Sequence, residues 1–156
     1  MIAMLGSLGA LVTAVVGLCW LRARIVVVRV EGISMEPTLH ADDRVVVRRL
    51  PASRLRAGQM VVIERPHYDG LWTWRATGAS IQQRKWIIKR LAALPGEPSA
   101  VDPDLLFAVP SGHAVVLGDN TNASTDSRVF GLVPVDRILG VVVRRYAEST
   151  PLSLSL

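Results

Sequence analysis

Cysteine is almost absent from this chain, because Cys19 is the only one among 156 residues. A single cysteine cannot form an intrachain disulfide, and it rules out a cysteine-based zinc cluster. Cys19 lies in an apolar run and is a poor lipid-attachment site, because the residue before it is Leu18 and not a small residue. We interpret it as a small buried hydrophobe. No motif implies a metal or an organic cofactor, so we expect none.

Charge is absent from the first 21 residues, MIAMLGSLGALVTAVVGLCWL. A helix of this length extends about 30 Å, the thickness of the hydrocarbon core of a bilayer. A cleaved signal would need a basic start and a small-residue cleavage site, and neither precedes Trp20. A buried core helix would carry a polar stripe, whereas this run has only Ser7 and Thr13. We therefore expect residues 1–21 to form a transmembrane anchor with Trp20 at the interface.

The basic residues do not settle how this anchor is oriented. Arg22, Arg24 and Arg29 all follow the run, so the positive-inside rule alone places the large domain in the cytoplasm.

The formal net charge is +5, but the basic residues are dispersed among expected strands and no recognition motif accompanies them. We expect no nucleic-acid partner, and attraction to an anionic membrane surface explains the charge at least as well.

After the apolar run, the sequence changes to short β-branched segments separated by Gly and Pro turn signals. These segments predict strands at residues 24–32, 43–50, 59–66, 85–96, 113–119 and 138–146. No long amphipathic helical pattern follows residue 21. The predicted fold class is mainly β: an antiparallel, folded or barrel-like sheet over residues 22–148, with one N-terminal transmembrane helix and a flexible tail at 149–156.

Residues 67–84 are the least regular stretch and include GLWTWRATG. Trp72 and Trp74 share a face if this segment is extended. The segment is either a hairpin or loop packed on the sheet, or an apolar patch that enters the membrane interface. The sequence favours neither.

The stretch EGISMEPTLH contains the first candidate for chemistry, Ser34. A Ser in a turn is usually a backbone hydrogen bonder, and Thr38 could cap a short helical turn equally well. A nucleophilic Ser would need a base. His40, His67 and His113 have no evident orienting partner, so nothing favours a Ser-His-Asp triad.

Lys89 is a better candidate for the base. In the segment KWIIKRL, strand alternation places it on one face with Ile87 and Leu91, where it is the sole charge. A free lysine, with a pKa of about 10.4, is neutral in only about 1 molecule in 2,500 at pH 7. Burial lowers that pKa, and a neutral lysine can accept the proton of a Ser hydroxyl. The commoner alternative is a lysine that snorkels past its neighbours to water.

The segment GDNTNASTDSRVFG, residues 118–131, concentrates short polar side chains directly after a predicted strand. It could be a polar loop held by Asx-turns. Asp126 and Arg128 could also form an ion pair across the loop. The hydroxyl of Ser124 could then orient a lysine amine.

GISMEPTL, KRLAALPGE and GDNTNASTDSRVFG together resemble, in this order, the nucleophile, general-base and last conserved segments of the type I signal peptidase family. The resemblance implies a compact membrane-bound serine endopeptidase that removes signal peptides from exported preproteins. Ser34 would attack the scissile carbonyl, and Lys89 would act as general base and then as general acid toward the leaving amine. Ser124 would hydrogen-bond the amine of Lys89.

The resemblance also implies supporting roles for further residues. Ion pairs would hold the site together through Arg90, Asp119, Asp126 and Arg128. Shallow pockets that favour Ala-X-Ala before the cut would be lined by Met35, Leu39 and Ile88. The backbone N–H of Ser34 would stabilise the oxyanion. Some members have a hydroxyl residue two positions earlier, where this chain has Gly32, so a backbone N–H or a water would substitute there.

The family orientation places the catalytic domain on the outer face of the plasma membrane, with a single span, which conflicts with the arginine count. The implied partners are the lipid bilayer and preproteins that carry signal peptides. Two alternatives stay open. One is a related Ser/Lys peptidase with a single dedicated exported or conjugative substrate. The other is a non-catalytic membrane-tethered β module that binds proteins or anionic lipid.

Overall fold

The computed structural model describes residues 24–66, 84–99 and 108–146, together with Val15, Gly17, Trp72 and Val101. Most of the predicted anchor, most of the irregular segment 67–84 and the predicted tail lie outside the described residues, so the interpretations of them stay predictions. Within the described part of the chain, no helix is long and apolar enough to cross a membrane.

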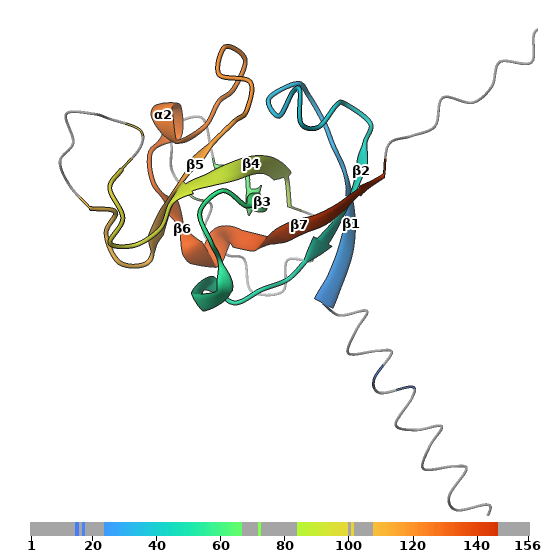
Figure 1. The fold of residues 1–156 in the computed structure, drawn as a ribbon, viewed down its shortest axis with the longest axis horizontal. Helices are drawn as coiled ribbons and strands as arrows, with labels where there is room; N and C mark the ends of the chain where they lie inside the picture. The colour runs from blue at the N-terminus through green and yellow to red at the C-terminus, as the bar shows by residue number, and fades with distance from the viewer. Residues whose placement is uncertain are drawn as a thin grey trace, which may run out of the picture.

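Seven strands form an antiparallel sheet (Figure 1). They are β1 (Ile25–Arg29), β2 (Arg44–Arg48), β3 (Met60–Glu64), β4 (Trp86–Ala93), β5 (His113–Leu117), β6 (Val133–Pro134) and β7 (Ile138–Tyr146). The short helices are η1 (Ala52–Arg54), α2 (Ser127–Phe130) and η3 (Val135–Arg137). The prediction of a mainly β, antiparallel fold is confirmed, and all six predicted strands are present. Strand β6 and the three short helices were not predicted.

The sheet is curled, and the last strand in the sequence lies near its middle. The order is β1-β2-β7-β3-β4-β5-β6, and β7 pairs with β2 through residues 141–146 and with β3 through residues 138–141. Register shifts interrupt three of the ladders, in β2–β7, β3–β7 and β4–β5. Such irregularities increase the local twist of a sheet. They therefore help the short strands to curl around the core.

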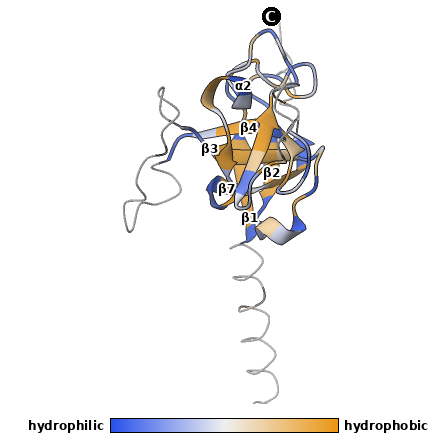
Figure 2. Cartoon of the chain, turned by 90° about the vertical axis from the view of Figure 1, so that its left-hand side faces the viewer, coloured by the Kyte–Doolittle hydropathy of each residue, from blue (hydrophilic) through white to orange (hydrophobic). Residues whose placement is uncertain are grey.

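Strands β3 and β4 bury apolar side chains on both faces, and two hydrophobic clusters result. The first cluster consists of Leu55, Val61, Ile63, Leu91, Ala114, Val116, Val133 and Val141. The second consists of Val30, Met35, Leu39, Val45, Val47, Val62 and Ile88. Figure 2 shows the predominantly apolar colouring of β3 and β4. The second cluster matters for function because it includes part of the turn that carries Ser34.

Strand β4 shows the alternation that the sequence predicts. Ile87 and Leu91 pack with the first cluster, whereas Trp86 and Ile88 pack with the second. Lys89 lies between Ile87 and Leu91 along the strand and is 2% exposed. The structure therefore excludes a lysine that snorkels to water.

Gly140 marks a close approach between β7 and the end of β2. A Cβ atom at this position would lie 2.8 Å from the carbonyl carbon of Arg48 and 2.9 Å from the Cα atom of Arg49. These neighbours are backbone atoms of a paired strand and the residue after it, so they cannot rotate away.

We predict that Gly140→Ala lowers the free energy of unfolding by about 1–3 kcal/mol, the usual cost of forcing extra volume into a packed site. Urea denaturation followed by tryptophan fluorescence measures this change. Val143→Ala is the control, because Val143 lies in the same strand and is 49% exposed. The control should lose less than about 1 kcal/mol. Equal stability of Gly140→Ala and the unaltered protein would contradict the close approach.

Candidate active site

The turn between β1 and β2 holds Ser34 above the second hydrophobic cluster. Met35 and Leu39 are 2% and 1% exposed, so the turn is anchored by two apolar side chains four residues apart. The backbone N–H of Leu39 donates to the carbonyl of Met35 at 2.9 Å, which closes one helical turn. The base of the turn is closed by Val30 N–H, which donates to the carbonyl of Asp43 at 2.8 Å. Ser34, which directly precedes Met35, is half-buried.

Lys89 is buried and its amine makes one specific contact. The Nζ atom donates to Oγ of Ser124 at 2.9 Å. Burial lowers the pKa of Lys89 from 10.5 to about 8, the charge of Asp126 opposes this shift, and the charges of Arg128 and Arg65 add to it. With a pKa near 8, about one amine in ten is neutral at pH 7, roughly 200 times the share in free lysine.

Ser124 acts on both charged partners of the site. Its oxygen accepts from the amine of Lys89, and hydrogen bonding by its side chain is one of the causes that hold the pKa of Asp126 down. An ionised carboxylate only accepts hydrogen bonds, so a Ser124 hydroxyl that points toward Asp126 leaves its oxygen lone pairs for Lys89. With the amine donating to Ser124, the lone pair of a neutral Lys89 is available to another proton donor.

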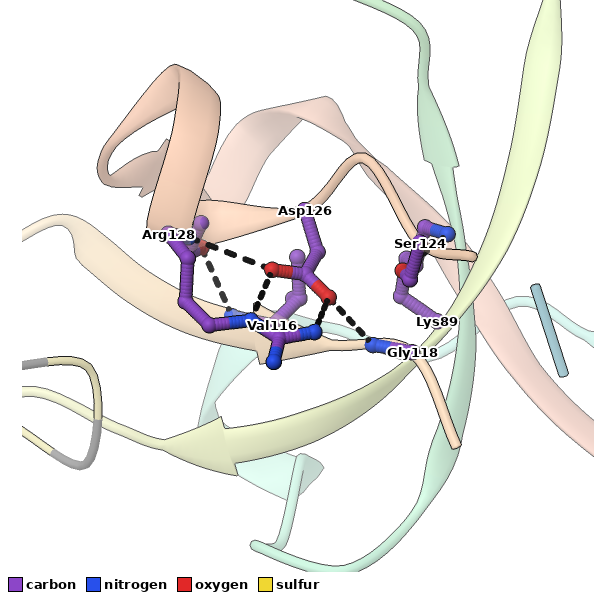
Figure 3. A network of polar contacts seen from close by, with 7 residues as sticks. Lys89, Val116, Gly118, Ser124, Asp126 and Arg128 are labelled. Carbon is purple, nitrogen blue, oxygen red and sulfur yellow. Dashed lines mark hydrogen bonds and ion pairs between the residues drawn. The ribbon is translucent and has the colours of Figure 1, made fainter. Parts of the chain in front are cut away.

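Asp126 is the centre of the polar network in Figure 3. The residue is 0% exposed and accepts from Gly118 N–H at 2.8 Å. Arg128 Nη2 and Nε donate to it at 2.7 and 2.9 Å. The Asp126 side chain also caps the N-terminus of α2 by accepting from the backbone N–H of Arg128. Burial by itself raises the pKa of Asp126, but hydrogen bonds from Arg128, Gly118 N–H and Ser124 outweigh it and hold the pKa below the usual range. The carboxylate is thus ionised at neutral pH.

Asp119 forms a second network that ties three elements together. Arg90, next to Lys89 in β4, binds its two carboxylate oxygens at 2.7 and 2.6 Å. Thr38 of the Ser34 turn donates to the same carboxylate at 2.5 Å. Arg90 also donates to the carbonyl of Gly58 at 2.7 Å. The hydrogen bonds from Arg90, with a smaller contribution from Thr38, lower the pKa of Asp119 against the effect of its partial burial.

Two residues that the sequence analysis did not select also position the Ser34 turn. The backbone N–H of Asn120 donates to the carbonyl of Ser34, and its Nδ2 donates to the carbonyl of Ile33, both at 3.1 Å. A Cβ atom at Gly118 would lie 2.5 Å from Cβ of Ser124 and 2.7 Å from the carbonyl oxygen of Ser34. Only glycine permits the backbone to pass so close to both. The sequence offered one signal of this close approach, because Gly118 lies at the end of a predicted strand, where a glycine often marks a backbone that passes near another group.

Ser34 lies where two cavities meet. The smaller has a volume of about 40 Å³ and is lined by Ser34, Gly32, Met35 and Ile88 among others. The larger is an open groove of about 450 Å³, and both Ser34 and Lys89 line it. Leu39 lines neither of these two cavities and lies in the second hydrophobic cluster. The structure thus brings all the predicted site residues to one region, with Leu39 beneath the turn.

The arrangement contains the parts that an acyl-transfer site needs. A hydroxyl and a buried amine of lowered pKa share one groove, and two ionised carboxylates hold the segments that carry them. Among the described residues, no group of three or more His, Cys, Asp and Glu side chains could hold a metal ion.

Comparison with known proteins identifies the family of the chain. The model of the family described as "Signal peptidase, peptidase S26" matches residues 4–107 and 98–147. The mitochondrial ATP-independent inner membrane protease subunit 1a of Arabidopsis thaliana is 30% identical over 126 residues, which cover 74% of this chain and 67% of that protein. The probable signal peptidase I-2 of Synechocystis is 29% identical over 162 residues, which cover 87% of this chain and 70% of that protein.

A signal peptidase I from Enterococcus faecalis is 20% identical, with a TM-score of 0.38, and the match covers 58% of this chain and 97% of that structure. The chain spans about two thirds of the length of the curated relatives it matches. The family match and the identity to these relatives confirm the resemblance inferred from the three sequence segments. The chain belongs to the signal peptidase family, peptidase S26, whose members are serine endopeptidases.

Proposed function

We propose that this chain is a membrane-anchored signal peptidase that uses Ser34 as nucleophile and Lys89 as general base. The observation that carries the proposal is the buried amine of Lys89, which lines the same groove as Ser34 and donates to Ser124. Its lowered pKa supplies a neutral base at physiological pH. The two carboxylate networks fix the geometry before substrate arrives.

In the proposed mechanism, neutral Lys89 takes the proton of Ser34 as Oγ attacks the scissile carbonyl. The negative charge on the carbonyl oxygen is stabilised by the backbone N–H of Ser34, with the N–H of Gly32 or a water as a second donor. The ammonium of Lys89 then protonates the leaving amine, and an acyl-enzyme on Ser34 remains. Water, deprotonated by Lys89, hydrolyses this ester, and the proton returns to Ser34.

The smaller cavity supports a preference for a small side chain before the cut. Its volume of about 40 Å³ is about a tenth of that of the larger groove, about 450 Å³. Met35 and Ile88 belong to the closely packed second hydrophobic cluster, so their side chains cannot easily move to enlarge the cavity. An Ala residue fits such a site, in agreement with cleavage after Ala-X-Ala.

We further propose that residues 1–21 anchor the chain by a single span, with the catalytic domain on the outer face of the plasma membrane, where signal peptides emerge. The apolar, uncharged composition of this segment supports an anchor. The family supports the outer orientation, whereas the arginines after the run favour the opposite one. Signal-peptide-bearing preproteins are the expected substrates.

The first prediction concerns the dyad. Ser34→Ala or Lys89→Met should reduce cleavage of a preprotein with an Ala-X-Ala site by at least about 1,000-fold, because each variant removes a reacting group. Mass spectrometry of the products from detergent-solubilised protein measures both the rate and the bond that is cut. Ser53→Ala and Lys85→Met are matched controls, because both residues are exposed.

The controls should retain activity. Cleavage by both dyad variants at the unaltered rate would contradict the assignment. A protein that cuts no general preprotein but is labelled at Ser34 by an acylating probe would have a single dedicated substrate. A protein that shows neither activity nor labelling would be a binding module.

The second prediction concerns pH. Lys89 is active as the neutral amine, so kcat/KM should rise about tenfold per pH unit below its pKa of about 8 and level off above it. Rates measured from pH 6 to 10 on one substrate test this. A flat profile between pH 6 and 9 would show that a group other than Lys89 is the base.

The third prediction concerns the smaller cavity. Replacing the Ala directly before the cut by Leu should lower kcat/KM by roughly 10- to 100-fold, because the extra methyl groups overfill a cavity of about 40 Å³. A Gly at the same position is the control and should be tolerated better than Leu. Equal rates for Ala and Leu substrates would contradict this assignment of the cavity.

A further inference from the structure

The larger groove carries a positive charge beside the reacting groups. Most of its described lining is apolar or uncharged: Gly32, Ile33, Ser34, Pro66, Ile87, Ala123, Thr125, Val129 and Phe130. The charged residues among the described lining are Arg65 and Lys89. Lys89 acts as the neutral amine, whereas an Arg side chain is always protonated in proteins. Arg65 therefore supplies a permanent charge in the groove when the enzyme is ready to react.

The backbone of Arg65 is held firmly although its side chain is exposed. The residue directly follows β3, and its N–H donates to the carbonyl of Lys85 at 2.8 Å, which extends the pairing of β3 with β4. The charge of Arg65 also reaches the catalytic amine, because it contributes to the lowered pKa of Lys89. A charge that acts on this amine will also act on substrate atoms in the same groove.

The two cavities can be assigned to opposite sides of the scissile bond, if the proposed function holds. They share Gly32, Ser34 and Ile87, so the scissile carbonyl lies at their junction. Lys89 lines the larger groove and is not among the residues lining the smaller cavity. Lys89 must protonate the leaving amine. The groove therefore receives the residues after the cut, and the smaller cavity receives the residue before it.

We propose that Arg65 makes this enzyme select substrates with an acidic residue among the first positions after the cut, and disfavour a basic residue there. A carboxylate in the groove would form a charge-assisted hydrogen bond with the guanidinium, which can bind both oxygens. A basic residue would be repelled by the same charge. Because Arg65 is exposed, the effect is modest, about two- to fivefold in kcat/KM for each charge change.

The test compares peptides with one Ala-X-Ala site that differ only by Glu, Gln or Lys. The change is made at one of the first three positions after the cut at a time. The unaltered enzyme, Arg65→Gln and Arg65→Glu are assayed at one pH and low salt. Arg54→Gln is the matched control, because Arg54 is an exposed arginine in η1 that is not among the described residues lining the groove.

The unaltered enzyme and the control should prefer Glu over Gln over Lys at one or more of these positions. Arg65→Gln should lose this order and Arg65→Glu should reverse it. The preference should also shrink as ionic strength rises. Because it is a ratio within one enzyme, a general loss of activity does not affect it.

Equal rates for the three peptides with the unaltered enzyme would overturn this inference and leave the proposed function intact. The same would follow if Arg65→Gln kept the preference. Failure of the unaltered enzyme to cut any peptide would overturn the proposed function, and the inference with it.

Discussion

The site depends on the buried amine of Lys89, which lies close enough to Asp126 to be affected by its charge and yet can lose its proton. Burial drives Lys89 toward its neutral form, whereas the charge of Asp126 favours the ammonium. A direct ion pair between the two would give the carboxylate its largest effect and would remove the base. Two contacts oppose this: Arg128 binds both oxygens of Asp126, and the amine of Lys89 donates to Ser124. Ser124 thus orients the amine, while Asp126 acts on it through its charge.

The fold supplies this arrangement by bringing three segments to one end of the curled sheet. The buried face of β4 places Lys89 beside the first hydrophobic cluster, and the Ser34 turn rests on the second. The segment after β5 joins them through Asp119, which binds both Arg90 and Thr38, and through Asn120, which holds the carbonyl of Ser34. Because each contact joins residues far apart in sequence, the site exists only when the whole sheet is formed.

The parts of this arrangement that could be predicted are those with local causes. Runs of β-branched residues predicted six strands, and period-two alternation predicted the face of Lys89. Strand β6 was missed because two residues, Val133 and Pro134, carry no periodicity, and α2 was missed because it has only four residues. Asn120 contacts a residue 87 positions away, and no local pattern encodes such a contact. The resemblance named the roles of Ser34 and Lys89, but the position of Arg65 in the groove required the fold.

The low pKa of Lys89 has a consequence for stability. A shift from 10.5 to about 8 corresponds to roughly 3–4 kcal/mol, since each pKa unit is about 1.4 kcal/mol. The unfolded chain binds the proton more tightly, so this cost is present at pH 7 and fades only as the pH rises from 8 toward 10.5. It is a large fraction of the typical net stability of a domain, about 5–15 kcal/mol. The lowered pKa values of Asp126 and Asp119 act in the opposite direction, because each carboxylate binds its proton less tightly in the folded chain and so stabilises the fold at pH 7. The residues around the base therefore also help to keep its segment folded.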